Sequence, residues 1–326
     1  MLSAMDTVPK LSVIIIVRNS VGTIARALDS IIAQHYPNLE VIVWDGLSTD
    51  GTLEVIQKYS SLVTVLKSER DHGPPDAYNK AIALTTGDFV GCLNADDEYE
   101  PGALWTVGDA IARQPDAEVV SFGIIYRSQD GRDRMTVGGY YADDRQLSLA
   151  LECVLTENQT FLLSRFFKKS LFAEVGPFNF DRNFWYYSND REWTTRLALR
   201  GCRNAIIPKA LYGFSFGQTT LSNNPENYTR IIEEHMMIAD NLLARTDLSE
   251  THRRIVKRWR NRQLVFGFWQ ALAGIKIDKA EQFMKQGLSY GKANFLLLTF
   301  YLPIMKVLKK FGLRLSGGID RGKIRV

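Results

Sequence analysis

The strongest constraint on the fold is a regular alternation, over residues 11 to 93, of short apolar runs with segments of helical periodicity. The first run, Leu11 to Val17, is almost entirely apolar and predicts a strand buried on both faces. From Thr23 to Gln34, apolar residues return at three- and four-residue spacing, which predicts a helix. The run Leu39 to Trp44 predicts a second strand. Such a chain predicts an α/β fold with a mostly parallel sheet covered by helices.

The alternation continues as far as the fourth strand. The further expected elements are a helix at 52 to 59, a strand at 62 to 66, a helix at 76 to 85 and a strand at 88 to 93. Because the carboxyl ends of parallel strands meet at one edge of a sheet, ligands of such folds bind there. The loops expected to face that site follow Val17, Trp44, Leu66 and Leu93.

The charge of the chain argues against a dedicated nucleic-acid binder. The 326 residues carry a formal net charge of +4, and the basic residues are spread out except in His252 to Arg262 and Lys306 to Arg325. The first residues lack the basic start and apolar run of a secretory signal. The apolar run Phe295 to Met305 has about half the length of a membrane crossing and contains Pro303. We therefore expect a cytoplasmic protein.

The loop after the second strand places Asp45 before Gly46 and the hydroxyl residues Ser48 and Thr49. A carboxylate in this position can accept the imino hydrogen of a nucleobase, and the small polar residues can seat a ribose. Capping of the next helix by Thr49 or Asp50 accounts for the hydroxyl residues equally well. Capping does not account for Asp45.

The loop after the fourth strand, Asn94 to Glu98, carries three acidic residues at a strand end. Such carboxylates repel one another unless a cation lies between them, and Mg²⁺ and Mn²⁺ prefer oxygen ligands. A solvated acidic turn is the alternative. The three cysteines lie far apart and have no spacing typical of a zinc site.

A third polar loop runs from Ser68 to Lys80 into the start of a predicted helix. Backbone amides at that helix start, with the cations Arg70 and Lys80, are suited to a diphosphate. The first strand is followed by Arg18 to Gly22, which matches neither GxGxxG nor GxxxxGK[ST]. Dinucleotide oxidoreductases and P-loop NTPases are therefore disfavoured.

Residues 9 to 220 resemble the family 2 glycosyltransferases with a GT-A fold, and most closely the branch that builds bacterial surface polysaccharides and O-antigens. The resemblance rests on Arg18-Asn19 after the first strand, Ser30 to Pro37, Asp45-Gly46, Ser48 to Thr52, Ser68-Glu69, Asp71, Gly73, Asp76-Ala77, Asn79-Lys80, Thr86 to Asp88 and Leu93 to Asp97. Their order along two thirds of the chain makes the resemblance specific.

The resemblance implies a nucleotide-sugar donor site, usually for uridine. By it, Val17, Asn19 and Asp45 bind the base and ribose, and Asp76 and Lys80 lie along the sugar and diphosphate. It also implies a domain layout: a catalytic domain at 1–225, with a nucleotide-binding half at about 9–125 and an acceptor-binding half at about 126–225, and a helical C-terminal extension at 226–326.

The resemblance also implies a metal and a general base. The segment Asn94-Ala95-Asp96 corresponds to the DxD-type motif, so Asp96 is the expected ligand of Mg²⁺ or Mn²⁺ and all three residues lie at the donor. Asn94 replaces a carboxylate, which leaves the number of protein ligands open. Asp190, ahead of a helix, corresponds to the general base. Its alternative is a helix cap beside an ion pair of Glu192 with Arg196.

The sequence thus predicts an inverting, metal-dependent glycosyltransferase that moves a sugar, most often from UDP, to a hydroxyl of a glycan or lipid-linked glycan. A nucleotide-sugar-binding protein without catalysis is the alternative. A nucleotidyltransferase would need a basic, glycine-rich phosphate loop after the first strand, and this sequence has none there. Phe216 to Ser222 resembles the loop that closes over the donor phosphates. The aromatic and basic C-terminal helices predict either contact with the cytoplasmic face of the inner membrane or packing on the catalytic domain.

Overall fold

The computed structural model describes residues 8–128, 136–140, 144–156, 162–180, 187–216, 227–274, 276–296 and 299. The chain forms two compact units, Met1–Val256 and Lys257–Val326. The predicted catalytic domain therefore lies within the first unit, which extends past the predicted boundary at 225. The predicted phosphate loop is outside the described residues from 217 to 222, as is the whole of the basic stretch Lys306 to Arg325.

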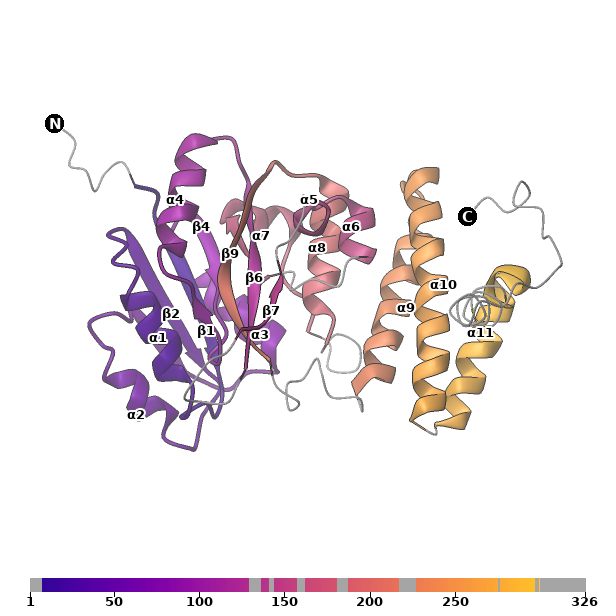
Figure 1. Cartoon of the computed structure of the whole chain (residues 1–326), viewed down its shortest axis with the longest axis horizontal. Helices are drawn as coiled ribbons and strands as arrows, with labels where there is room; N and C mark the ends of the chain where they lie inside the picture. The colour runs from indigo at the N-terminus through magenta and orange to yellow at the C-terminus, as the bar shows by residue number, and fades with distance from the viewer. Residues whose placement is uncertain are drawn as a thin grey trace. The chain divides into compact units, whose positions relative to one another are not determined.

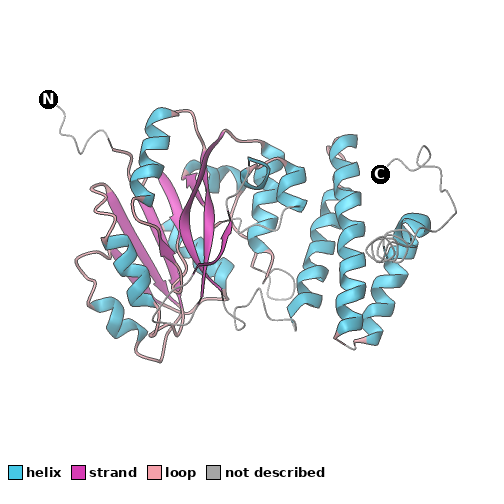
Figure 2. Cartoon of the chain, viewed as in Figure 1, coloured by secondary structure: helices cyan, strands magenta, loops and turns pink. Residues whose placement is uncertain are grey.

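The first unit contains all nine described strands (Figures 1 and 2). The strands are β1 (Leu11–Val17), β2 (Leu39–Asp45), β3 (Val65–Ser68), β4 (Phe89–Cys92), β5 (Glu98–Tyr99), β6 (Val119–Ser128), β7 (Thr136–Tyr140), β8 (Arg165–Lys168) and β9 (Asn204–Phe216). Its helices are α1 (Ile24–Ile32), α2 (Thr52–Gln57), α3 (Pro74–Ala83), α4 (Ala103–Arg113), α5 (Asp144–Leu147), α6 (Leu151–Thr156), α7 (Ser170–Val175), α8 (Asn189–Arg200) and α9 (Tyr228–Ala244).

The sheet has the strand order β3-β2-β1-β4-β8-β6-β9-β5, with β7 paired to β6. The pairings among β3, β2, β1 and β4 are all parallel, which confirms the predicted α/β sheet for residues 11–92. Strand β8 then pairs antiparallel with both β4 and β6, so the sheet is mixed beyond β4. Strand β6 pairs in parallel with β9.

Helices cover both faces of the sheet, and β1 explains why. Val13 and Ile15 point into the core shared with α1, α2 and α4, whereas Ile14 points into the core shared with α3, α6, α7 and α8. Side chains of a strand alternate between the faces, so an unbroken apolar run has to be covered twice. The predicted double burial of β1 is confirmed.

Two predicted elements begin elsewhere than expected. The third strand starts at Val65 rather than at 62, because the chain after α2 continues in turns that join the amides of Leu62 and Val63 to the carbonyl of Tyr59. Helix α3 starts at Pro74 rather than at 76. Proline lacks an N–H, and the first helical turn does not need one.

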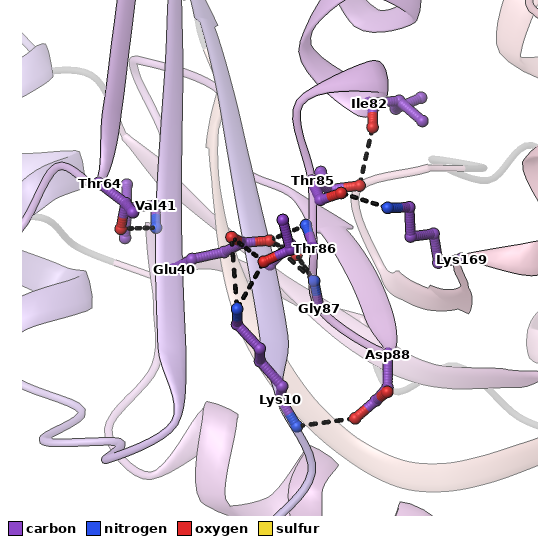
Figure 3. Close-up of polar contacts among 11 residues, drawn as sticks. Lys10, Glu40, Val41, Thr64, Ile82, Thr85, Thr86, Gly87, Asp88 and Lys169 are labelled. Atoms are coloured by element: carbon purple, nitrogen blue, oxygen red, sulfur yellow. Dashed lines mark hydrogen bonds and ion pairs between the residues drawn. The ribbon is translucent and has the colours of Figure 1, made fainter.

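At the edge of the sheet opposite the predicted site, Glu40 ties three strands together (Figure 3). Its buried carboxylate accepts hydrogen bonds from the Thr86 hydroxyl, at 2.7 Å, and from the amide of Gly87, at 2.8 Å. Burial raises the pKa of this carboxyl, but the hydrogen bonds from Ser12, Thr86 and Gly87 outweigh burial and lower the pKa. The Thr86 to Asp88 motif is thus accounted for by folding.

The second unit is helical. It contains most of α10 (Glu250–Ala273) and all of α11 (Ile277–Leu296). Within it, the Arg260 guanidinium lies 3.6 Å from the ring centroid of Tyr290, a cation–π contact that joins the two helices. Among the described helices, none is both long and apolar enough to cross a membrane.

Candidate nucleotide-sugar site

The loops after β1 and β2 are joined by reciprocal hydrogen bonds. The Asn19 amide donates to the Ser48 hydroxyl at 2.8 Å, and the Asn19 side-chain oxygen accepts from the Thr49 amide at 2.9 Å. The Val17 carbonyl accepts from the Gly46 amide at 2.9 Å. Asn19 has φ of 51°, a left-handed conformation that asparagine tolerates better than most residues. The segment of Val17 and Asn19, two predicted donor-site residues, is therefore joined to the loop that follows Asp45.

Asp45 is fully buried beneath this loop pair. Its carboxylate accepts hydrogen bonds from the amide and hydroxyl of Ser48, with the amide at 3.1 Å, and from the Ser68 hydroxyl at 2.7 Å. Asp45 therefore orders the loops after β2 and β3 in this conformation. For the predicted contact with a nucleobase, the Ser48 hydroxyl would have to move away from the Asp45 carboxylate.

Gly46 lets the third loop approach the second. A Cβ at this position would lie 2.6 Å from Oδ2 of Asp71, closer than side-chain atoms approach one another. Asp71 in turn accepts a hydrogen bond from the Gly73 amide at 2.9 Å, and Gly73 has φ of 108°. Three positions that carry the family resemblance thus have a conformational reason for their residue types.

Asp76 and Lys80 form an ion pair at 3.0 Å on successive turns of α3. Asp76 also accepts from the backbone and the ring of His72, at 2.9 and 3.1 Å. Burial raises the pKa of Asp76, but the bonds from Lys80 and His72 outweigh burial and lower it. The Lys80 ammonium lies 5.3 Å from the Trp44 ring centroid. The two predicted donor-binding residues are therefore adjacent.

The start of α3 offers fewer amides than the sequence suggested for a diphosphate. Its first two residues, Pro74 and Pro75, have no N–H, and the Gly73 amide is already bound to Asp71. Positive charge on this helix comes from the Lys80 side chain.

Asp97 is the structural centre of the acidic loop. Its buried carboxylate accepts hydrogen bonds from the Ser215 amide at 2.6 Å, the Tyr212 hydroxyl at 2.7 Å and the Asn94 side-chain amide at 2.9 Å. Burial and then the negative charge of Asp96 raise its pKa to about 7, although the three donors act in the opposite direction. Asn94 therefore supplies a donor where an aspartate would add a further negative charge.

The neighbouring Asp96 is half-buried, and its backbone anchors the loop. The Asp96 carbonyl accepts a hydrogen bond from the Arg26 guanidinium at 2.7 Å and another from the Ser215 hydroxyl. Ala95, between the two polar residues, is buried in the core. Asn94, Ala95 and Asp96 therefore lie on one fixed turn at the carboxyl end of β4.

This turn is suited to a cation that is bound mainly by the phosphates of a substrate and by few protein ligands. The described residues contain no group of three or more His, Cys, Asp or Glu side chains placed to hold a metal ion. Both carboxylate oxygens of Asp97 accept protein hydrogen bonds, so Asp97 is less suited to bind a cation than Asp96, the ligand predicted from the sequence. Mg²⁺ is commonly held by one or two carboxylates together with substrate phosphates, so these residues are compatible with such an ion.

Asp190 lies in the first turn of α8. Its carboxylate accepts a hydrogen bond from the Arg191 amide at 2.7 Å, so it satisfies one unpaired amide of the helix start. Burial raises the pKa of the Asp190 carboxyl, and the positive charges of Arg191 and Arg165 oppose that rise only in part. The predicted ion pair of Glu192 with Arg196 is confirmed at 2.8 Å. Asp190 thus lies inside the first turn of α8 and not at its N-cap, which is Ser188.

Tyr78 links Asp190 to the acidic turn. Its phenol is buried on α3, and burial together with the nearby charges of Cys92, Asp190, Asp97 and Asp96 raises its pKa. The same hydroxyl lies 3.4 Å from the side-chain oxygen of Asn94. The charges of Asp190 and Asp96, the residues predicted as base and as metal ligand, therefore both act on the Tyr78 hydroxyl.

Some residues that build the site were missed from the sequence. Tyr212 and Ser215 lie on β9, more than a hundred residues after the turn that they hold. Asn79 exchanges two hydrogen bonds with the backbone of Phe178, each 2.8 Å long. Asn79 belongs to the residues that carry the family resemblance, so the sequence did point to it. Nothing in the sequence of β9 indicates that Tyr212 and Ser215 bind Asp97.

Known proteins resemble this chain in sequence and in fold. The family model described as "Glycosyl transferase family 2" matches residues 12–186. A PGL/p-HBAD biosynthesis glycosyltransferase of Mycobacterium bovis is 30% identical over 175 residues, which are 52% of this chain and 64% of the relative. The succinoglycan biosynthesis protein ExoO of Rhizobium meliloti is 32% identical over 102 residues, 31% of this chain and 29% of that protein.

Two solved structures share the fold at low sequence identity. Residues 1–349 of S. aureus TarS, in complex with UDP-GlcNAc, have a TM-score of 0.67 at 20% identity, over 96% of this chain and 95% of that one. The mannosyltransferase PcManGT of Pyrobaculum calidifontis, with GDP-Man and Mn²⁺, has a TM-score of 0.59 at 19% identity, over 93% and 82%. The expected GT-A fold is confirmed.

Proposed function

Because the chain belongs to glycosyl transferase family 2, we propose that it is an inverting enzyme that transfers a sugar from a UDP-sugar to a hydroxyl of a glycan or lipid-linked glycan. The observation that carries the proposal is that Asp96 follows β4 at the same end of the sheet as the paired loops after β1 and β2, and that the charges of Asp96 and Asp190 both act on Tyr78. A proton acceptor and a ligand for a diphosphate-bound cation are what a displacement at the anomeric carbon needs.

In the proposed reaction the acceptor oxygen attacks the anomeric carbon from the side opposite the diphosphate. The new carbon–oxygen bond forms as the bond to UDP breaks, the acceptor proton passes to the carboxylate of Asp190, and UDP leaves with the bonding pair. A bound Mg²⁺ or Mn²⁺, with Asp96 as its ligand, would supply positive charge to the leaving diphosphate. A carboxylate with a raised pKa is a stronger base than an ordinary one, which supports the role of Asp190.

The donor loops support a nucleotide ligand. Val17 and Asp45 end β1 and β2, whose following loops are paired through Asn19. Asp76 lies in the first turn of α3 and Lys80 in its last turn. UDP-GlcNAc is bound by a structural neighbour, which favours a uridine donor. The names of two relatives refer to PGL/p-HBAD biosynthesis and to succinoglycan biosynthesis, and the second supports a surface polysaccharide as the class of product.

Turnover of a panel of UDP-, GDP- and dTDP-sugars tests the proposal. We expect the purified chain to release nucleoside diphosphate from one UDP-sugar when Mn²⁺ is present, and to lose at least about 100-fold of that rate in EDTA, because several kcal/mol of charge stabilisation is removed. Heat-denatured protein is the control. Tight binding of a donor with no release, even with added glycan acceptors, would instead favour a nucleotide-sugar-binding protein without catalysis.

We also propose that α10 contacts the cytoplasmic face of the inner membrane, where a lipid-linked acceptor would lie. Arg258, Arg262, Phe266 and Trp269 are exposed at three- and four-residue spacing, so they share one face of the helix. Phe266 and Trp269 are 47% and 44% exposed. A basic stretch followed by exposed aromatic rings on one helical face is suited to an anionic lipid surface.

Flotation with lipid vesicles measures this contact. We expect the full chain to float with phosphatidylglycerol vesicles and not with phosphatidylcholine vesicles. The double change Phe266→Ser with Trp269→Ser should lower binding at least about tenfold, since each ring loses more than about 1.5 kcal/mol of burial. Ile32→Ser, which removes a 43% exposed apolar residue from α1, is the matched control. Equal flotation of the double variant and wild type would count against membrane contact.

A further inference from the structure

A buried carboxylate on α9 caps the helix that carries Asp190. Glu234 is 2% exposed, and its carboxylate accepts hydrogen bonds from the Ser188 amide at 2.7 Å and the Tyr187 amide at 3.0 Å. These residues immediately precede α8, which begins at Asn189. An element 46 residues farther along the chain thus fixes the entry to α8.

The capping is supplied by Glu234 because the local residue does not supply it. Ser188 occupies the N-cap position of α8, yet its buried hydroxyl has no hydrogen-bond partner and makes no capping bond. Helix starts leave several amides without a partner, and a negative charge near them is favourable. The carboxylate of Glu234 satisfies both requirements from outside the helix.

The first turns of α9 hold the same segment by two further contacts. The Tyr187 hydroxyl donates to the side-chain oxygen of Asn227 at 3.0 Å, and the Arg230 guanidinium lies 5.9 Å from the Tyr187 ring centroid. Arg230 also lies 3.9 Å from the Glu234 carboxylate. Asn227, Arg230 and Glu234 therefore form one clamp on Tyr187 and Ser188, which we call the α9 clamp.

We propose that Glu234 is a positioning residue for Asp190, an inference that rests on the proposed role of Asp190 as the base. Asp190 lies two residues after Ser188, and its carboxylate accepts a hydrogen bond from the adjacent Arg191 amide. Both partners of that bond belong to α8, so the bond would move together with the helix. It therefore does not fix the position of the carboxylate relative to the acceptor. The α9 clamp fixes the helix start, and misplacement of a reacting group by about 1 Å can cost about 100-fold in rate.

Glu234→Gln tests the proposal because it removes the charge while keeping the size of the side chain. With the nucleotide sugar that the wild type turns over in the donor panel, we expect kcat to fall about tenfold or more and the donor Kd to change less than twofold. The matched control is Glu250→Gln on α10, whose side chain is 83% exposed. If the donor Kd rose by as much as kcat fell, with the same fraction of folded protein as in wild type, a positioning role would be contradicted.

A double-mutant cycle separates this inference from the proposed function. If Glu234 acts through Asp190, Glu234→Gln should cost less than about twofold once Asp190→Asn is present, because the two changes remove one interaction. The same tenfold loss in both backgrounds would overturn the positioning role and leave the proposed function intact. Near-normal turnover of Asp190→Asn alone would instead overturn the assignment of the base.

Two further measurements keep the test decisive if Glu234→Gln folds poorly. Arg230→Met leaves the buried carboxylate in place but removes its ion pair and the contact with Tyr187, and Arg230 is 46% exposed. We expect a smaller fall in kcat that also disappears in the Asp190→Asn background. Amide hydrogen exchange at residues 187 and 188 should be faster in this variant than in wild type. Unchanged exchange and unchanged kcat would overturn the clamp.

Discussion

Asp190→Asn is expected to lower kcat by about two to four orders of magnitude, which is the usual contribution of a positioned general base. The substitution keeps the size of the side chain and leaves an oxygen for the Arg191 amide, so α8 should still form. Donor binding should be unchanged because the donor loops lie after β1 to β4. The measurement is steady-state turnover of the preferred nucleotide sugar, together with calorimetric binding of that donor.

The matched control is Glu192→Gln, two residues farther along the same helix. Glu192 pairs with Arg196, which also donates to the carbonyl of Pro177 at 2.8 Å and so remains held when the carboxylate is lost. We expect kcat of this variant within about threefold of wild type, the scale of a partly exposed ion pair. Near-normal turnover by Asp190→Asn would rule out the proposed base.

The same residue predicts the pH dependence of turnover. Burial raises the pKa of Asp190 above the ordinary 3.8, and the base acts only when it is deprotonated. kcat should therefore fall as the pH drops through this raised pKa, at a higher pH than an ordinary aspartate would give. Since a raised carboxyl pKa favours the neutral acid, its burial costs folding stability above that pKa, and Asp190→Asn should be at least as stable as wild type at neutral pH.

The second large effect is expected for Asp96→Asn. Removing the charge of the proposed metal ligand should lower kcat about 100-fold or more and raise the Mn²⁺ concentration needed for half-maximal rate. The turn should survive, because the backbone carbonyl of Asp96 accepts hydrogen bonds from Arg26 and Ser215 and is kept in the variant. Turnover measured over a Mn²⁺ titration gives both quantities.

Asp109→Asn is the matched control for that experiment. Asp109 is 54% exposed on α4, where it pairs with Arg113 at 3.0 Å, and the change removes the same charge from the surface. Its turnover and Mn²⁺ requirement should match wild type. If Asp96→Asn gave the same metal titration as this control, Asp96 would not be the ligand.

The first half of the fold was predictable because its signals are local. The apolar run of β1, the periodicity of α1 and the Asp45-Gly46 turn each lie within a few residues, and each element appears close to its expected position. The shift of β3 to Val65 has a local cause as well, since turns after α2 compete with an extended chain. Patterns of this kind predict that a helix or strand is present better than they predict where it begins and ends.

The rest of the candidate site depends on contacts between distant residues. Strand β5 has two residues, too few for any periodic signal, and it is stabilised by pairing with Gly213 and Tyr212 of β9. The capping of α8 by Glu234 could not be anticipated either, because Ser188 has a good capping side chain that the structure does not use. Tertiary packing decides between such options, and a single sequence does not record it.

The dependence of Asp97 on β9 has a consequence for the order in which the protein is assembled during synthesis. The segment matched by the family model ends at residue 186, whereas two of the donors that hold Asp97 are Tyr212 and Ser215. A nascent chain that has emerged only as far as β8 can complete β1 to β4 but leaves a buried carboxylate without two of its three donors. The acidic turn is therefore completed late, by closure of a loop of more than a hundred residues.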